Sequence, residues 1–218
     1  MLTGGVAVAT TAGAPRRWRG QTHDDRVRAR RGQLLAAGFA LLGDHGTAGV
    51  TMRAACRHAG LSLRYFYENF PDTDALIVAV YDECNNELLA AITDAAVPLR
   101  DDLDAAVRAA IDAGAGYFAA DPRRVRILLR EPLSNDLLTE RRAAIAPELL
   151  AALVQAGGID PRRPAEDDAM TASAFSGAFT ALILDWSDGR LAVSRAQLVD
   201  YAASLVLAQL QRPAGGQP

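Results

Sequence analysis

The chain contains 218 residues, of which 50% are apolar and 22% are charged, and it carries a net charge of −3. This composition is typical of a soluble globular protein and excludes a disordered or fibrous chain. No apolar run reaches the about 18 residues of a membrane-spanning helix, and residues 1–15 lack the basic start and apolar block of a signal peptide. We therefore expect a cytoplasmic protein with no membrane partner.

The positive charge is concentrated near the N-terminus. Residues 14–68 contain ten arginines against four acidic residues, a net charge of +6, so the rest of the chain carries −9. This asymmetry indicates that one end of the molecule meets a polyanion. We expect residues 1–20 to form a flexible arm. Its arginines, which either lie in a DNA minor groove or remain solvated, are Arg16, Arg17 and Arg19.

Helical patterns begin at residue 24, and no convincing strand pattern is present. Apolar residues at helical spacing predict a first helix over residues 24–42. Thr51 is expected to cap a short helix that Gly60 ends. Ser62 is expected to cap the next helix, which runs to about Phe70.

A long amphipathic helix is predicted next, because Asp72 or Thr73 can cap it and Pro98 breaks it after about Ala96. Further helices are predicted over residues 101–120, 122–130, 135–156, 165–187 and 194–211. The sequence therefore predicts an all-α protein with three parts. These are the arm over 1–20, a three-helix helix-turn-helix domain over 21–71, and a larger helical domain over 72–212.

The stretch TMRAACRHAGLSLRYFYENF, residues 51–70, has the layout of a helix-turn-helix. Gly60 permits the left-handed conformation that a tight turn needs, and Leu61 fills the angle between the two helices. Phe66 and Phe70 are four residues apart, so they share one face and anchor the second helix to the core.

The same helix leaves other side chains to point away from the core. Arg64 and Tyr67 share a different flank, and Tyr65 is expected to project with them. A helix N-terminus of this kind can enter a major groove, where arginine binds guanine through two hydrogen bonds. The alternative is a solvated helix face with ordinary ion pairs.

These elements resemble the TetR family of transcriptional regulators over residues 24–76. The matching positions are Thr51, Arg53, Gly60, Leu61, Ser62, Tyr67, Phe70, Asp72 and Leu76. The resemblance implies that phosphates are bound by Thr51, Ser62 and Tyr67. It also implies that base edges are met by Leu63, Arg64 and Tyr65, with Arg53 and Asn69 among the residues at the DNA.

Two positions depart from the family's pattern. Thr73 stands where the family usually has a lysine aimed at a phosphate, and Asn69 stands where a histidine is common. The resemblance implies a dimeric repressor of a pseudo-palindromic operator, released by a small effector. The alternatives are an activator and a helical interaction module that has lost operator binding.

The last two predicted helices are candidates for the homodimer interface. Residues 165–187 carry a flank of small residues, and residues 194–211 are strongly apolar. Small flanks let helices approach closely across a two-fold axis, while packing within one chain is the alternative.

The resemblance also implies an effector site between the middle helices. We expect a hydrophobic or aromatic ligand because the candidate residues are mostly apolar, although each is also a candidate for the core. They are Tyr81, Asn85, Leu88, Tyr117, Phe118, Leu128, Leu153, Phe175 and Phe179.

No catalytic pattern is present, so we do not expect an enzyme. The chain lacks a GxSxG nucleophile motif and an HExxH metal motif. His23, His45 and His58 lack metal-ligand spacing, and Cys56 and Cys84 do not form a CxxC pair. We therefore expect no metal or other cofactor.

Overall fold

The computed structural model describes residues 23–145 and 165–210. These residues form helices and turns without a strand, which confirms the all-α prediction. The α-helices are α1 (His23–His45), α2 (Met52–Ala59), α3 (Leu63–Tyr67), α4 (Thr73–Ala96), α5 (Leu103–Ala120), α6 (Pro122–Val125), a helix over 136–145, α8 (Ala165–Ser187) and α9 (Arg195–Leu210). None of the described helices is long and apolar enough to cross a membrane.

Short helical turns connect these helices. They are the 3-10 turns η1 (Thr47–Gly49), η2 (Val97–Leu99) and η4 (Glu131–Leu133), and the π-helical turn η3 (Arg126–Arg130). The helix predicted over 122–130 is helical throughout these bounds, but its second half is a π-helical turn rather than α-helix. Pro132 offers a physical reason, since its ring clashes with the carbonyl oxygen four residues earlier and so favours a wider turn.

The helix starts follow from side chains that accept backbone hydrogen bonds. Thr51 accepts from Ala54 N at 3.1 Å, and Asp72 accepts from Ala75 N at 2.8 Å. The predicted cap at Thr51 is confirmed, and Asp72 rather than Thr73 caps α4. Ser62 occupies the N-cap of α3, but its side chain makes no capping hydrogen bond, so that prediction is wrong in detail.

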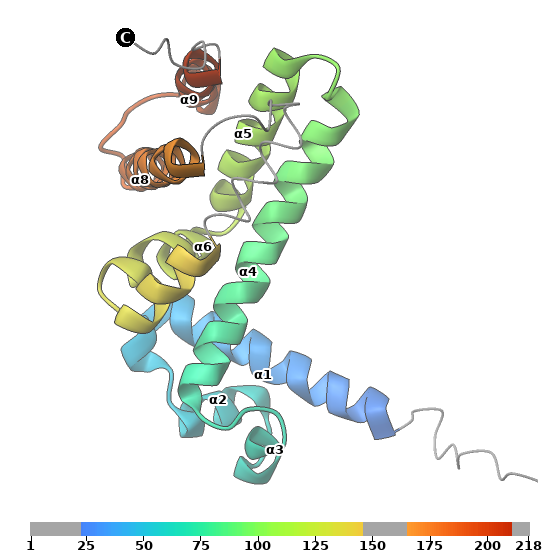
Figure 1. Cartoon of the computed structure of the whole chain (residues 1–218). Helices are drawn as coiled ribbons and strands as arrows, with labels where there is room; N and C mark the ends of the chain where they lie inside the picture. Colours follow the sequence, from blue (N-terminus) through green and yellow to red (C-terminus); the bar gives the residue numbers. More distant parts are fainter. Residues whose placement is uncertain (1–22, 146–164, 211–218) are drawn as a thin grey trace, which may run out of the picture.

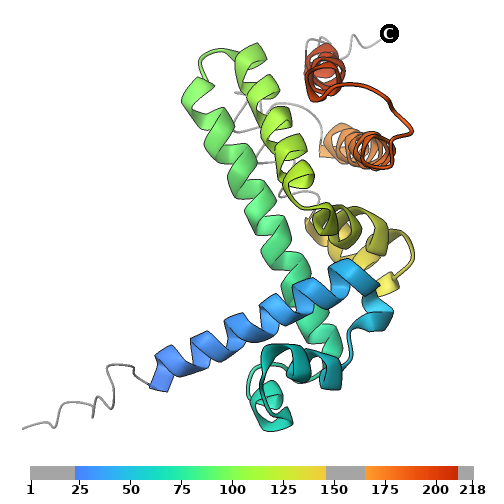
Figure 2. The ribbon, with the colours of Figure 1, turned by 180° about the vertical axis from the view of Figure 1, so that it is seen from behind.

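The N-terminal helices form a small unit at one end of α4 (Figure 1). The longest described helix, α4, leads away from this unit, and α5 returns beside it. Figure 2 shows from the other side that α5 lies between α4 and the pair α8 and α9. The helix α6 returns the chain to α1, so the larger helical part also contacts the N-terminal unit there.

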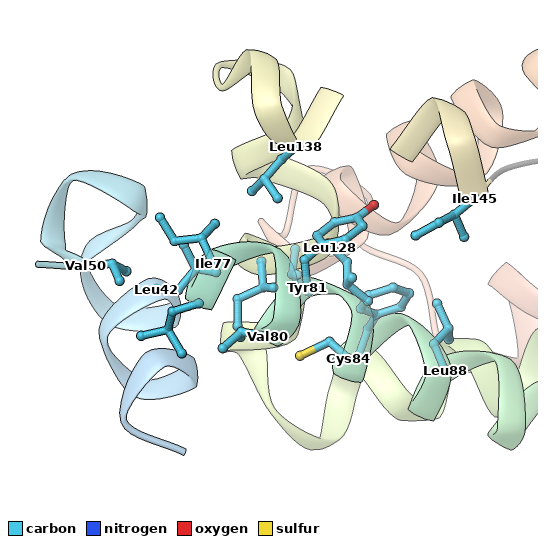
Figure 3. Close-up of a cluster of buried hydrophobic side chains, with 14 of the residues drawn as sticks. Leu42, Val50, Ile77, Val80, Tyr81, Cys84, Leu88, Leu128, Leu138 and Ile145 are labelled. Atoms are coloured by element: carbon cyan, nitrogen blue, oxygen red, sulfur yellow. The ribbon is translucent and has the colours of Figure 1, made fainter. Parts of the chain in front are cut away.

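One continuous core joins the N-terminal unit to the larger helical part. Leu34, Phe66, Leu76 and Ile127 are fully buried and belong to the same cluster. Figure 3 shows side chains of α1, α4 and the following segments meeting in this cluster. Burying each large apolar side chain stabilises the fold by about 1.5–3 kcal/mol, so α1–α3 are held firmly on α4. The division at residue 72 stays a prediction.

Candidate nucleic-acid interface

The turn between α2 and α3 fixes the direction of α3. Gly60 has φ 66° and ψ 28°, which is the left-handed conformation that its position predicts. Leu61 N donates to Cys56 O at 2.9 Å, which closes the end of α2. The Leu61 side chain is half-buried and packs against the core. The left-handed conformation predicted for Gly60 is confirmed, whereas the position of Leu61 between the two helices stays a prediction.

Two faces of α3 differ sharply in exposure. Phe66 is 0% exposed and Phe70, just after the helix, is 2% exposed, as their spacing predicts. On the other side, Leu63 is 45% exposed and Tyr67 is 59% exposed. The Arg64 side chain is 84% exposed. The buried rings therefore hold α3 down while Leu63, Arg64 and Tyr67 reach solvent.

Arg64 takes part in an ion pair that extends to α1. Its Nε donates to Oε1 of Glu68 at 3.0 Å. The other carboxylate oxygen of Glu68 lies 3.7 Å from Nη2 of Arg30. Neither Glu68 nor Arg30 was among the predicted site residues, because only the fold brings Arg30 to α3. The i, i+4 spacing of Arg64 and Glu68 was a local signal that was available.

Tyr65 does not project freely, which corrects the expectation from the sequence. It is half-buried, and the guanidinium carbon of Arg30 lies 4.3 Å from the centre of its ring. Asn69 is also engaged within the chain, since its side-chain amide donates to Tyr65 O at 2.8 Å. Arg31 covers the Phe70 ring at 4.4 Å. Arg30 and Arg31 therefore brace α3 from α1.

The remaining DNA candidates lie around this surface or outside it. Ser62, Thr51 and Arg53 are exposed, although the Thr51 hydroxyl also caps α2. Thr73, at the position usually taken by lysine in the family, is half-buried at the start of α4. The arm arginines Arg16, Arg17 and Arg19 lie outside the described residues.

Most of the predicted effector residues are buried side chains in the core. Those buried are Tyr81, Asn85, Leu88, Tyr117, Phe118 and Leu128. Desolvation raises the pKa of Tyr81 to about 12, so it is a neutral hydroxyl at physiological pH. Phe175 and Phe179 are half-buried, with ring centres 6.0 Å apart in a stacked arrangement. Leu153 lies outside the described residues.

Tyr117 is held in a polar network between α5 and α4. Its hydroxyl lies 2.9 Å from Cys84 O and 3.1 Å from Oε2 of Glu87. The guanidinium carbon of Arg124 lies 4.0 Å from the centre of the Tyr117 ring. Burial raises the pKa of Tyr117. This network gives Tyr117 a structural role in the described conformation.

A groove of about 460 Å³ lies where α1, α4 and α6 meet. None of the eight predicted effector residues within the described part of the chain lines it. Its lining is mixed in polarity and consists of Gly32, Leu35, Ala36, Phe39, Val80, Glu83, Cys84, Glu87, Asp121, Arg123 and Arg124. Across the described residues, no three or more His, Cys, Asp and Glu side chains gather into a metal-binding group.

Direct contacts link the end of α1 to the segment from α6 to η4. Oε2 of Glu131 accepts from Thr47 N at 2.9 Å. The guanidinium carbon of Arg123 lies 4.7 Å from the centre of the Phe39 ring. Gly43 leaves space for Arg123, because a Cβ at that position would lie 2.5 Å from the Arg123 Cβ. A movement of α6 would therefore displace the end of α1.

Exposed apolar residues lie on α8 and α9. Met170 is 65% exposed and Tyr201 is 57% exposed. Gly177 and Ala181 are exposed on α8, and a Cβ at Gly177 would meet no atom of the described residues within 4 Å. The small flank predicted on this helix is therefore partly uncovered within a single chain.

Comparisons with known proteins agree with this geometry. The sequence model of the family described as "Bacterial regulatory proteins, tetR family" matches residues 34–80, which include α2, α3 and the start of α4. No curated protein matches the chain in sequence.

The fold resembles several solved structures at low sequence identity. A TetR-like transcriptional regulator from Rhodococcus sp. RHA1 has a TM-score of 0.58 and 19% identity over 84% of this chain and 97% of that chain. The fatty acid degradation regulator FadR from Bacillus halodurans has a TM-score of 0.59 and 15% identity over 84% and 97%.

A TetR family transcription regulator from Marinobacter aquaeolei VT8 has a TM-score of 0.63 and 18% identity over 83% of this chain and 97% of that chain. These likenesses show the fold across most of the chain, and the family match identifies its N-terminal helices as a DNA-binding domain. Members of this family are DNA-binding transcription factors rather than enzymes. The chain therefore carries the N-terminal domain of the TetR family of transcriptional regulators.

Proposed function

We propose that this regulator is a dimeric repressor that reads a pseudo-palindromic operator and is released by a small apolar effector. The observation that carries the proposal is the exposed Arg64 side chain on a helix anchored by the fully buried Phe66. An arginine presented at the start of a helix can bind O6 and N7 of guanine in the major groove. The buried Phe66 ring keeps α3 in a fixed position on the protein surface when Arg64 binds the base.

The other exposed side chains fit supporting roles at the DNA. Leu63 is suited to contact a thymine methyl group, since it is apolar and exposed beside Arg64. Tyr67, Thr51 and Ser62 carry hydroxyl groups that can donate to phosphates, which fixes the register on the duplex. Arg53 adds an exposed positive charge from α2. The arm arginines over residues 16–19 would add a minor-groove contact.

The dimer would form through α8 and α9. Exposed small residues on α8 allow close approach of a second copy, and Tyr201 on α9 supplies an exposed aromatic ring. A two-fold axis there would present two copies of α3 to half-sites about one helical turn apart, roughly 34–36 Å.

The effector would act by favouring one of two arrangements of the larger domain. The contacts of Glu131 with Thr47 and of Arg123 with Phe39 offer a route from that domain to α1. A ligand shifts such an equilibrium only by its difference in affinity for the two states. The predicted pocket residues are buried in the described conformation, so a ligand there requires their side chains to move apart.

The proposal is tested by measuring binding to the DNA upstream of the coding region as the salt concentration rises. A regulator of this kind shows a logarithmic slope of about −0.9 for each phosphate contact. Arg64→Ala should weaken binding to the preferred site by about 1–3 kcal/mol. Arg100→Ala is the matched control, because Arg100 is exposed near the distant α4–α5 connection. Equal affinities of both variants and the wild type would contradict the proposal.

A further inference from the structure

The exposed arginine of α3 is held by one particular nitrogen. Arg64 donates its Nε hydrogen to Glu68, and no other partner for its guanidinium is found in the part of the chain that the structure describes. A guanidinium has five N–H donors in a planar fork. Because Nε is occupied, the two terminal amino groups remain available. Their outer edge provides the parallel pair of donors that guanine O6 and N7 require.

Glu68 forms a second ion pair, with an arginine of α1. Its second carboxylate oxygen lies 3.7 Å from Nη2 of Arg30 in α1. The Arg30 side chain is only 18% exposed and lies over the half-buried Tyr65 ring. An isolated surface ion pair has no such anchor, and its two side chains remain free to separate.

We propose that Glu68 is a positioning residue for base recognition, which with Arg30 fixes Arg64 so that its terminal amino groups meet a guanine. This inference rests on the proposed operator binding and adds a residue that does not itself contact the base. Fixing a long side chain before binding removes part of the entropy loss on binding. For one side chain, the effect corresponds to about 2- to 12-fold in affinity for the correct base.

The negative charge of Glu68 means that its removal should change non-specific affinity and specificity in opposite directions. A carboxylate beside the DNA repels phosphates, so removing it strengthens binding to every sequence. The same removal frees Arg64 and weakens the preference for guanine. Glu68→Ala should therefore raise non-specific affinity while lowering specificity, whereas damage to the fold would lower both.

The test is a selection of sites from random-sequence duplex DNA with the full chain, followed by affinity measurements on the selected site. A second duplex replaces the guanine whose selection depends on Arg64, which Arg64→Ala identifies. Glu68→Ala should reduce the affinity ratio of the two duplexes by about 2- to 12-fold. Glu68→Gln should fall between Glu68→Ala and the wild type, because an amide oxygen still accepts from Nε.

Asp74→Ala is the matched control. Asp74 is an exposed carboxylate in the first turn of α4, so its removal changes the local charge without releasing Arg64. It should leave the ratio unchanged. If the wild type selects no site, the proposed function itself fails. If it selects a site and Arg64→Ala changes no base preference, the proposed role of Arg64 is wrong. The positioning role of Glu68 is then wrong as well. An unchanged ratio in Glu68→Ala would overturn only the positioning role of Glu68.

Discussion

Replacing Gly60 with alanine measures the free-energy cost of a side chain at the left-handed turn that sets the direction of α3. Gly60 has a left-handed backbone, and an added Cβ would meet no atom within 4 Å in the described part of the chain. No contact is lost or overcrowded, so the substitution acts through the backbone alone. An L residue in this conformation costs about 1–2 kcal/mol, and reduced freedom of the unfolded chain offsets about 0.4–1 kcal/mol. We expect Gly60→Ala to lower the free energy of unfolding by about 1 kcal/mol.

Gly32 provides the matched control for this substitution. It lies inside α1, and an added Cβ there also meets no atom within 4 Å among the residues that the structure describes. Because its backbone is helical, Gly32→Ala should instead stabilise the protein by about 0.5–1 kcal/mol. Equilibrium unfolding in urea, followed by far-UV circular dichroism, measures both changes as shifts of the midpoint at a constant slope. A stabilising effect of Gly60→Ala would refute the left-handed turn and the direction assigned to α3.

Three further predictions concern other parts of the molecule. Gly177→Arg should leave the chain folded but shift light-scattering mass from dimer to monomer, whereas Gly177→Ala should not; a dimeric Gly177→Arg variant would place the interface elsewhere. Glu131→Ala removes the acceptor for Thr47 N and should lower stability by about 1–3 kcal/mol in thermal unfolding, while no loss would show that this contact is not maintained. Burial raises the pKa of Cys56 and raises that of Cys84 to about 12, so neither thiol should react with a disulfide reagent at pH 8 before unfolding; rapid native labelling would contradict this burial.

Local sequence signals predicted the elements that depend on neighbouring residues. Thr51 and Gly60 mark the two ends of α2 because capping and the left-handed turn involve residues close in sequence. The spacing of Phe66 and Phe70 predicted which face of α3 is buried. The π-helical turn η3 was missed, since a helical pattern does not distinguish a π turn from an α-helix.

Contacts between segments that are distant in sequence could not be predicted from local sequence signals. Glu131 accepts from Thr47 N across 84 positions, and no pattern in either segment indicates that pairing. The position of Arg30 over Tyr65 likewise depends on how α1 crosses α3. The effector site was the least predictable part, because core and pocket residues share the same apolar pattern.

The central claim is that Arg64 reads a guanine in the major groove from the exposed end of α3. The most direct measurement compares a selected operator with the same duplex carrying 7-deazaguanine at the guanine assigned to Arg64, which lacks the N7 acceptor. The wild type should lose affinity on this duplex by about 1–3 kcal/mol, while Arg64→Ala should bind both duplexes equally. The same loss in the wild type and in Arg64→Ala would contradict the claim.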